Sequence, residues 1–184
     1  AQCDTPILET ITFTNGTEVQ TSYCGTVNDR GQRDGQGRLE YANYDVLYKN
    51  GNWKNDRLNG KGKTVFKNGY VFEGVYKNGK LTEGEFSFTN NGDLWTYKGE
   101  FNGYYFQGEG TEINDSKVRI TKKEGIFFSD NLFEGTETIK YKNSGVEITS
   151  KYVKGIATVL ERNDINSFKA EDIVGLSEST EINL

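Results

Sequence analysis

The alternation of apolar and polar positions along the chain predicts short β-strands separated by tight turns. Residues 72–92 show the pattern most clearly, because ring-bearing residues and glycines occupy every second position of two short runs. These positions are Phe72, Gly74, Tyr76, Gly84, Phe86 and Phe88. Between the runs lies Asn78-Gly79, a pair that accepts the positive φ angles of a type I′ turn. The segment therefore predicts a β-hairpin, and Asn91-Gly92 predicts the turn that follows it.

The same pattern recurs along the chain at nearly constant spacing. Five times a glycine is followed two residues later by an aromatic or apolar residue, and these glycines are Gly25, Gly51, Gly74, Gly99 and Gly125. A second glycine follows nine or ten residues on, and three units then continue as Gly-x-Gly. The positions expected to shape the repeats are Gly51, Trp53, Gly60, Gly62, Gly74, Tyr76, Gly99, Phe101, Gly108 and Gly110. So regular a lattice predicts an array of repeated hairpins.

Glycine inside a strand is costly unless a neighbour needs the space that its missing side chain leaves. Because the glycines recur opposite aromatic positions, we expect rings of one hairpin to lie over bare backbone of another. The regular aromatic positions are then core residues, and they are Trp53, Tyr76, Phe101 and Phe127. A low share of hydrophobic residues, 34%, fits a thin layer of packed rings.

The two ends of the chain differ from the repeats. Ile7–Thr14 and Thr17–Tyr23 predict a capping hairpin across Asn15-Gly16, and further turns are predicted at Asn50-Gly51 and Asn68-Gly69. Residues 146–153 and 156–160 continue the strand pattern, and residues 167–175 predict a short helix before a polar tail. We therefore expect a cap at 1–22, repeats at 23–145 and a C-terminal region at 146–184.

The repeats resemble the MORN repeat, whose pattern is Tyr-x-Gly-x-aromatic followed by Gly-x-Gly and Gly. Residues 49–69 and 97–110 carry this pattern best, and the resemblance covers roughly residues 23–145. Lys49 and Lys123 replace the leading Tyr, and Phe86 replaces the second Gly of Gly-x-Gly. The resemblance implies an all-β fold, an elongated single antiparallel sheet that meanders through successive hairpins. It also implies roles in protein assembly and, in some members, contact with lipid.

Composition excludes several classes of chemistry. Histidine is absent and only two cysteines occur, which excludes Ser-His-Asp catalysis and His- or Cys-ligated metal cages. A net charge of −5 without a basic stripe argues against a nucleic-acid partner, and no apolar run is long enough to span a membrane. The acidic turn at residues 28–31 fits ordinary turn chemistry better than a calcium loop. We predict no cofactor.

Paired carboxylates are the remaining catalytic hypothesis. Five glutamates on predicted strands could support glycoside hydrolysis, namely Glu83, Glu85, Glu100, Glu109 and Glu112. The competing interpretation places them on the solvated side of the sheet, beside lysines. No motif supports an enzyme, so the chain is predicted not to be one.

The two cysteines and the first residues of the chain indicate the cellular compartment in which the protein is expected to work. Cys3 and Cys24 would form one disulfide in an oxidising environment, although two free buried thiols are the alternative. The chain begins Ala1-Gln2-Cys3 without an initiator Met, which favours a mature end left by removal of a signal peptide. We therefore expect a periplasmic or secreted protein.

A less regular set of rings supplies the candidate partner-binding residues, which are Tyr44, Tyr48, Trp95, Tyr97, Tyr104 and Tyr105. Exposed Tyr and Trp bury much area at small entropic cost, and they also stack on sugars. The leading hypothesis is a non-catalytic repeat scaffold for protein–protein interaction, as an accessory subunit of an extracytoplasmic or cell-envelope assembly. The alternative is a carbohydrate-binding module that uses the same Tyr and Trp residues.

Overall fold

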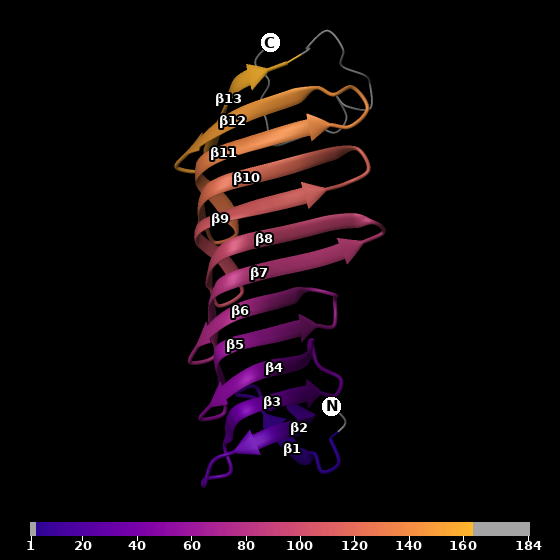
Figure 1. The fold of residues 1–184 in the computed structure, drawn as a ribbon, viewed down its shortest axis with the longest axis vertical. Helices are drawn as coiled ribbons and strands as arrows, with labels where there is room; N and C mark the ends of the chain where they lie inside the picture. Colours follow the sequence, from indigo (N-terminus) through magenta and orange to yellow (C-terminus); the bar gives the residue numbers. More distant parts are fainter. Residues whose placement is uncertain (1–2, 164–184) are drawn as a thin grey trace. The chain divides into compact units, whose positions relative to one another are not determined.

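The computed structural model describes residues 3–163, and within them the chain is all-β, as predicted (Figure 1). Thirteen strands form one antiparallel sheet in chain order, from β1 to β13. The strands are β1 (Ile7–Thr12), β2 (Glu18–Val27), β3 (Arg33–Tyr41), β4 (Val46–Lys54), β5 (Arg57–Phe66), β6 (Val71–Lys77), β7 (Lys80–Asn90), β8 (Asp93–Asn102), β9 (Tyr105–Asp115), β10 (Arg119–Phe128), β11 (Asn131–Tyr141), β12 (Glu147–Val153) and β13 (Ile156–Arg162).

The predicted meander of hairpins is therefore confirmed, including the first hairpin across Asn15-Gly16 and the strands after residue 145. The helix predicted at 167–175 lies outside the described residues. Within 3–163 there is no helix that could cross a membrane. The chain divides into two compact units: unit 1 contains residues up to 86 together with 102–104, and unit 2 contains residues 87–101 and those from 105 onwards.

Two-residue turns with positive φ angles join many of the strands. Asn78 and Gly79 have φ angles of 50° and 85°, as a type I′ turn requires. Asn55-Asp56, Ser129-Asp130 and Lys154-Gly155 make the same kind of turn. The turn predicted at Asn50-Gly51 is wrong, because both residues lie inside β4, where Gly51 pairs with glycines on both neighbouring strands.

Each of these turns is hydrogen-bonded to the hairpin before it. In unit 1 the amide of Asp56 donates to the carbonyl of Arg33 over 3.1 Å, and that of Gly79 donates to Leu58 over 2.8 Å. The turn between β8 and β9 bonds likewise, from Gly103 to Leu81. In unit 2 the same bond runs from Asp130 to Phe106 and from Gly155 to Phe133. The repeat is thus a hydrogen-bonding unit as well as a sequence pattern.

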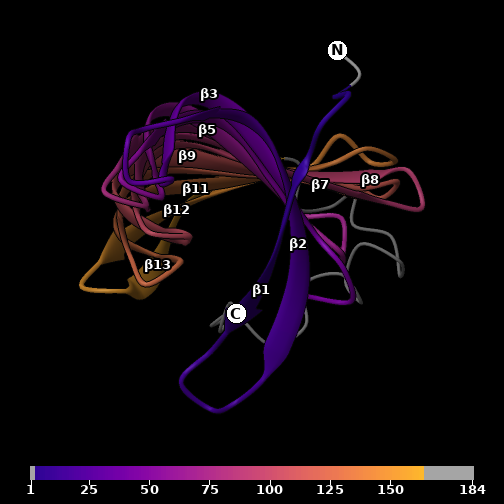
Figure 2. The same cartoon turned by 90° about the horizontal axis from the view of Figure 1, so that it is seen from below.

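In each unit a row of glycines crosses the strands. Its members are Gly25, Gly37, Gly51, Gly62, Gly74 and Gly84 in unit 1, and Gly99, Gly110, Gly125 and Gly135 in unit 2. At Gly51, where φ is 147°, a Cβ would overlap the carbonyl oxygen of Lys61 on β5. The backbones of β4 and β5 therefore approach so closely that no side chain fits at Gly51. In the view from below, β3 and β5 are curved (Figure 2).

Rings cover the glycine row and form the core. Tyr23 on β2 lies over Gly37, and its hydroxyl donates to the carbonyl of Thr26 over 2.8 Å. In unit 2, Tyr97 on β8 lies over Gly110 in the same manner. The regular aromatic positions Trp53, Tyr76, Phe101 and Phe127 are all at most 6% exposed. Gly35, Gly60 and Gly108 pair directly with three of these rings across the strands.

Candidate functional site

The six tyrosines and tryptophans proposed as partner contacts have very different environments. Tyr97 has no exposed surface, since its ring stacks on Phe106 at 4.0 Å between centroids and its hydroxyl donates to the carbonyl of Glu100. Burial raises the pKa of the Tyr97 hydroxyl above its ordinary value. As a surface contact Tyr97 is therefore a wrong assignment: it occupies the leading position of its repeat and covers the glycines.

Four of the others are half-buried and already engaged. The hydroxyl of Tyr104 lies 2.9 Å from that of Thr64, and its ring packs on Phe72 at 4.7 Å. Tyr44 stacks on Phe13, and Tyr48 lies under the guanidinium of Arg38 at 3.7 Å. Trp95 donates its indole N–H to Glu112 over 2.9 Å. Tyr105, with 60% of its surface exposed, is the one largely solvated member of the set.

The structure instead exposes a group of apolar side chains in unit 2. This apolar strip consists of Ile126, Phe128, Phe133, Val153 and Ile156, with 38%, 61%, 39%, 46% and 72% of their surfaces exposed. The rings of Phe128 and Phe133 lie 6.4 Å apart, and the bond from Gly155 to Phe133 holds the β12–β13 turn beside them. Val153 and Ile156 flank that turn and pair with each other.

The sequence does carry a signal for the strip. Phe127 and Phe128 are consecutive in an alternating strand, so their side chains point to opposite faces and only one can join the core. Phe127 is 1% exposed and Phe128 is 61% exposed. Phe133 reaches the outer side because a bulge shifts the register of β10 and β11 beside it. A bulge of this kind leaves no mark in the alternation itself.

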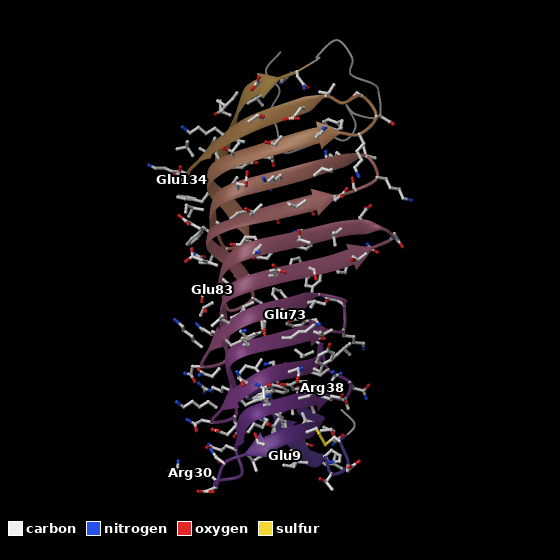
Figure 3. All side chains as sticks on the ribbon, in the orientation of Figure 1. Glu9, Arg30, Arg38, Glu73, Glu83 and Glu134 are labelled. Atoms are coloured by element: carbon white, nitrogen blue, oxygen red, sulfur yellow. A yellow bond between two sulfur atoms is a disulfide. The ribbon has the colours of Figure 1, made fainter. Side chains whose placement is uncertain are left out.

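Four of the five candidate glutamates are exposed, namely Glu83, Glu85, Glu100 and Glu109. Glu83 projects away from the ribbon (Figure 3). Glu112 departs from the predicted solvated position, because it is 7% exposed and shares Lys123 with Glu137, each at 3.8 Å from the ammonium group. Burial raises the pKa of Glu112, and the charge of Lys123 opposes that rise. The hydroxyl of Tyr152 donates to Glu137, and the indole of Trp95 donates to Glu112, so both carboxylates beside Lys123 also accept a hydrogen bond from an aromatic residue.

The Cys3–Cys24 disulfide is present, with 5.9 Å between the two Cα atoms. It ties the N-terminal segment to β2 beside a hollow of about 650 Å³. Polar side chains dominate the lining, among them Gln36, Arg38 and Glu40. Arg38 and Glu40 form an ion pair of 2.9 Å, and Arg38 lies on the same side of the ribbon as the disulfide (Figure 3).

Arg33 is a residue that the pattern analysis missed. In the next two hairpins of unit 1, the residue whose carbonyl accepts the bond from the following turn is a buried leucine, Leu58 or Leu81. Arg33 occupies this position in the hairpin of β2 and β3. Its guanidinium lies 5.2 Å from the centre of the Trp53 ring and forms ion pairs with Glu9 at 3.7 Å and Asp56 at 3.5 Å. Aligning the hairpins by their turns would have shown that Arg33 replaces a leucine.

Comparison with protein families agrees with the geometry of unit 1. The family model of the MORN repeat matches residues 23–46, which contain the second half of β2 and all of β3, and residues 50–69, which include β5. Repeats of this family are commonly non-catalytic scaffold modules. Residues 23–46 and 50–69 are therefore similar to MORN repeats.

Proposed function

We propose that this chain is a non-catalytic repeat scaffold that binds a protein partner through the apolar strip of unit 2. The observation that carries the proposal is the exposure of Phe128, Phe133 and Ile156 side by side on one surface. Contiguous apolar surface of this kind marks interaction sites, and aromatic side chains dominate the binding energy of protein interfaces.

Charged and polar residues surround the strip and suit a protein interface. Lys151, Lys154 and Glu134 lie on the same two hairpins, and Glu134 accepts a hydrogen bond from the amide of Lys154 over 3.1 Å. An apolar centre with a polar rim is the usual composition of a specific interface. The partner's contact segment should therefore be apolar at its centre.

The compartment proposed for this interaction is extracytoplasmic. The Cys3–Cys24 disulfide supports it, because disulfides persist in secreted and periplasmic proteins and are rare where thiols are kept reduced. The scaffold would then be an accessory subunit of a cell-envelope or secreted assembly.

Affinity capture from the envelope fraction and secretome of the source tests the proposal. A captured protein should bind the purified chain directly, and binding should weaken about tenfold or more in Phe128→Ser and Phe133→Ser, since each removes an aromatic anchor. Leu8→Ser is the matched control, because Leu8 is 76% exposed on β1 in unit 1. Equal binding by all three variants would contradict the role of the strip.

The carbohydrate-binding alternative predicts a different result. A glycan array would then show binding by the wild-type chain, and Trp95→Ala would abolish it through loss of ring stacking. Glycan binding that survives Phe128→Ser and fails in Trp95→Ala would replace the scaffold proposal.

A further inference from the structure

Lys49 stands where the repeat pattern has its leading Tyr. At the same position in other hairpins, Tyr23 and Tyr97 lie over a pair of facing glycines and bond the carbonyl three residues on. Lys49 pairs with Leu39 on one side and Thr64 on the other, both of which are buried. An amino group thus replaces a ring on the core face of unit 1.

The charge of Lys49 is not neutralised by its surroundings. Within residues 3–163, no carboxylate lies within 4.0 Å of its ammonium group. Burial lowers the pKa of Lys49 first, and the positive charge of Arg33 lowers it further. The contrast with Lys123 is direct, because that lysine replaces the same Tyr in unit 2 and is held between Glu112 and Glu137.

Arg33 contributes a second positive charge, close enough to lower the pKa of Lys49. Its guanidinium is itself paired, because the carboxylate of Asp56 lies 3.5 Å from Nε and that of Glu9 lies 3.7 Å from a terminal nitrogen. These two carboxylates offset the positive charge of Arg33, whereas the positive charge of Lys49 has no such counter-charge among the residues that the structure describes. A carboxylate beside Lys49 would supply the counter-charge that Glu112 and Glu137 give to Lys123.

We propose that Lys49, assisted by Arg33, binds an Asp or Glu side chain from an acidic segment of a protein partner. This inference rests on the proposed scaffold function and deepens it, since it names the chemistry of a second contact in unit 1. Lys49 is half-buried, so a single side chain can reach it. The net charge of −5 opposes docking on an anionic bilayer, whereas one carboxylate on a peptide meets only the local cations.

Fluorescence anisotropy with a labelled hexaglutamate peptide tests the site directly, and a hexaglutamine peptide controls for charge. We expect the wild-type chain to bind hexaglutamate and not hexaglutamine. Lys49→Tyr, which restores the ring of the repeat pattern, should weaken binding about tenfold or more, as should Lys49→Gln and Arg33→Leu. Lys61→Gln is the matched control, because Lys61 is exposed on β5 and should leave binding unchanged.

Three results would overturn the inference. The first is that hexaglutamate does not bind the wild-type chain. The second is that Lys49→Tyr binds the peptide as tightly as wild type, and the third is that Lys61→Gln loses as much affinity as Lys49→Tyr. Thermal unfolding of each variant verifies that it is folded. If one of the two Lys49 variants does not fold, the other still tests the site. Lys49-dependent binding to phosphatidylserine vesicles without peptide binding would assign the site to a membrane surface instead. Capture that depends on Phe128 while hexaglutamate fails would leave the scaffold function standing and remove only this contact.

Discussion

At the scale of single residues, glycine acts through the space that it leaves for a neighbouring ring. Gly110 adopts an ordinary strand conformation, yet a Cβ there would overlap three atoms of the Tyr97 side chain, its hydroxyl oxygen and two ring carbons. At Gly62 the nearest ring atom, from Tyr76, would lie 3.0 Å away. Gly62 and Gly110, each a member of the glycine row of its own unit, therefore differ in how much a side chain would disturb them.

Alanine at these two glycines should separate the two cases. Gly110→Ala should lower the free energy of unfolding by about 3 kcal/mol or more, because the Tyr97 ring has no room to move in its buried stack. Gly62→Ala should stay within about 1 kcal/mol of wild type, since Ala costs less conformational entropy in a strand and the contact is looser. Urea unfolding measures both, and equal losses at the two positions would contradict a steric role for the ring.

At the scale of the element, the turn is the part that links one hairpin to the next. Asp130 has a φ angle of 72° and uses both its groups: the amide donates to the carbonyl of Phe106, and the carboxylate accepts the amide of the same residue over 2.8 Å. Asp56 makes the equivalent pair of bonds with Arg33 in unit 1. A short polar side chain that tolerates positive φ suits both tasks.

Substitutions at Asp130 should rank by the tasks that they retain. Asp130→Asn keeps an acceptor and tolerates positive φ, so the free energy of unfolding should change by less than about 0.5 kcal/mol. Asp130→Gly loses the hydrogen bond alone and should cost about 1 kcal/mol, and Asp130→Ala adds backbone strain and should cost about 2 kcal/mol. Chemical denaturation in urea gives the order, and an alanine variant as stable as the asparagine variant would contradict it.

At the scale of the whole molecule, period-two alternation and Asn-Gly turns were enough to predict repeated β-hairpins, and the resemblance to MORN repeats supplied their order in one meandering sheet. Asn50-Gly51 shows where that logic fails, since the same dipeptide serves as a turn at 78–79 and as part of the glycine row in β4. Tyr97 and Phe133 show the equivalent failure for the surface. Both lie in strands, and only the three-dimensional structure decides that Tyr97 is covered while a bulge turns Phe133 outward.

The disulfide is the one covalent link that the structure adds to this architecture. Replacing both Cys3 and Cys24 with Ser should lower the free energy of unfolding by about 3 kcal/mol, because the unfolded chain regains the freedom of the closed loop. Wild-type protein unfolded in the presence of a reductant should approach the stability of the variant. A wild-type curve that reductant leaves unchanged, or a variant as stable as wild type, would contradict the stabilising role of the link.

The bonds between each turn and the preceding hairpin have a consequence for how such chains change in evolution. The amide donor and the carbonyl acceptor lie 21–24 residues apart in every case described above. The two groups therefore meet only when one full repeat of two strands and their turns lies between them. Removing a few residues from one strand would break that match and also shift the alternation by which rings find glycines. Within each unit, genes for this architecture should therefore grow and shrink by duplicating or deleting entire repeats, with small indels confined to the loops that carry no such bond.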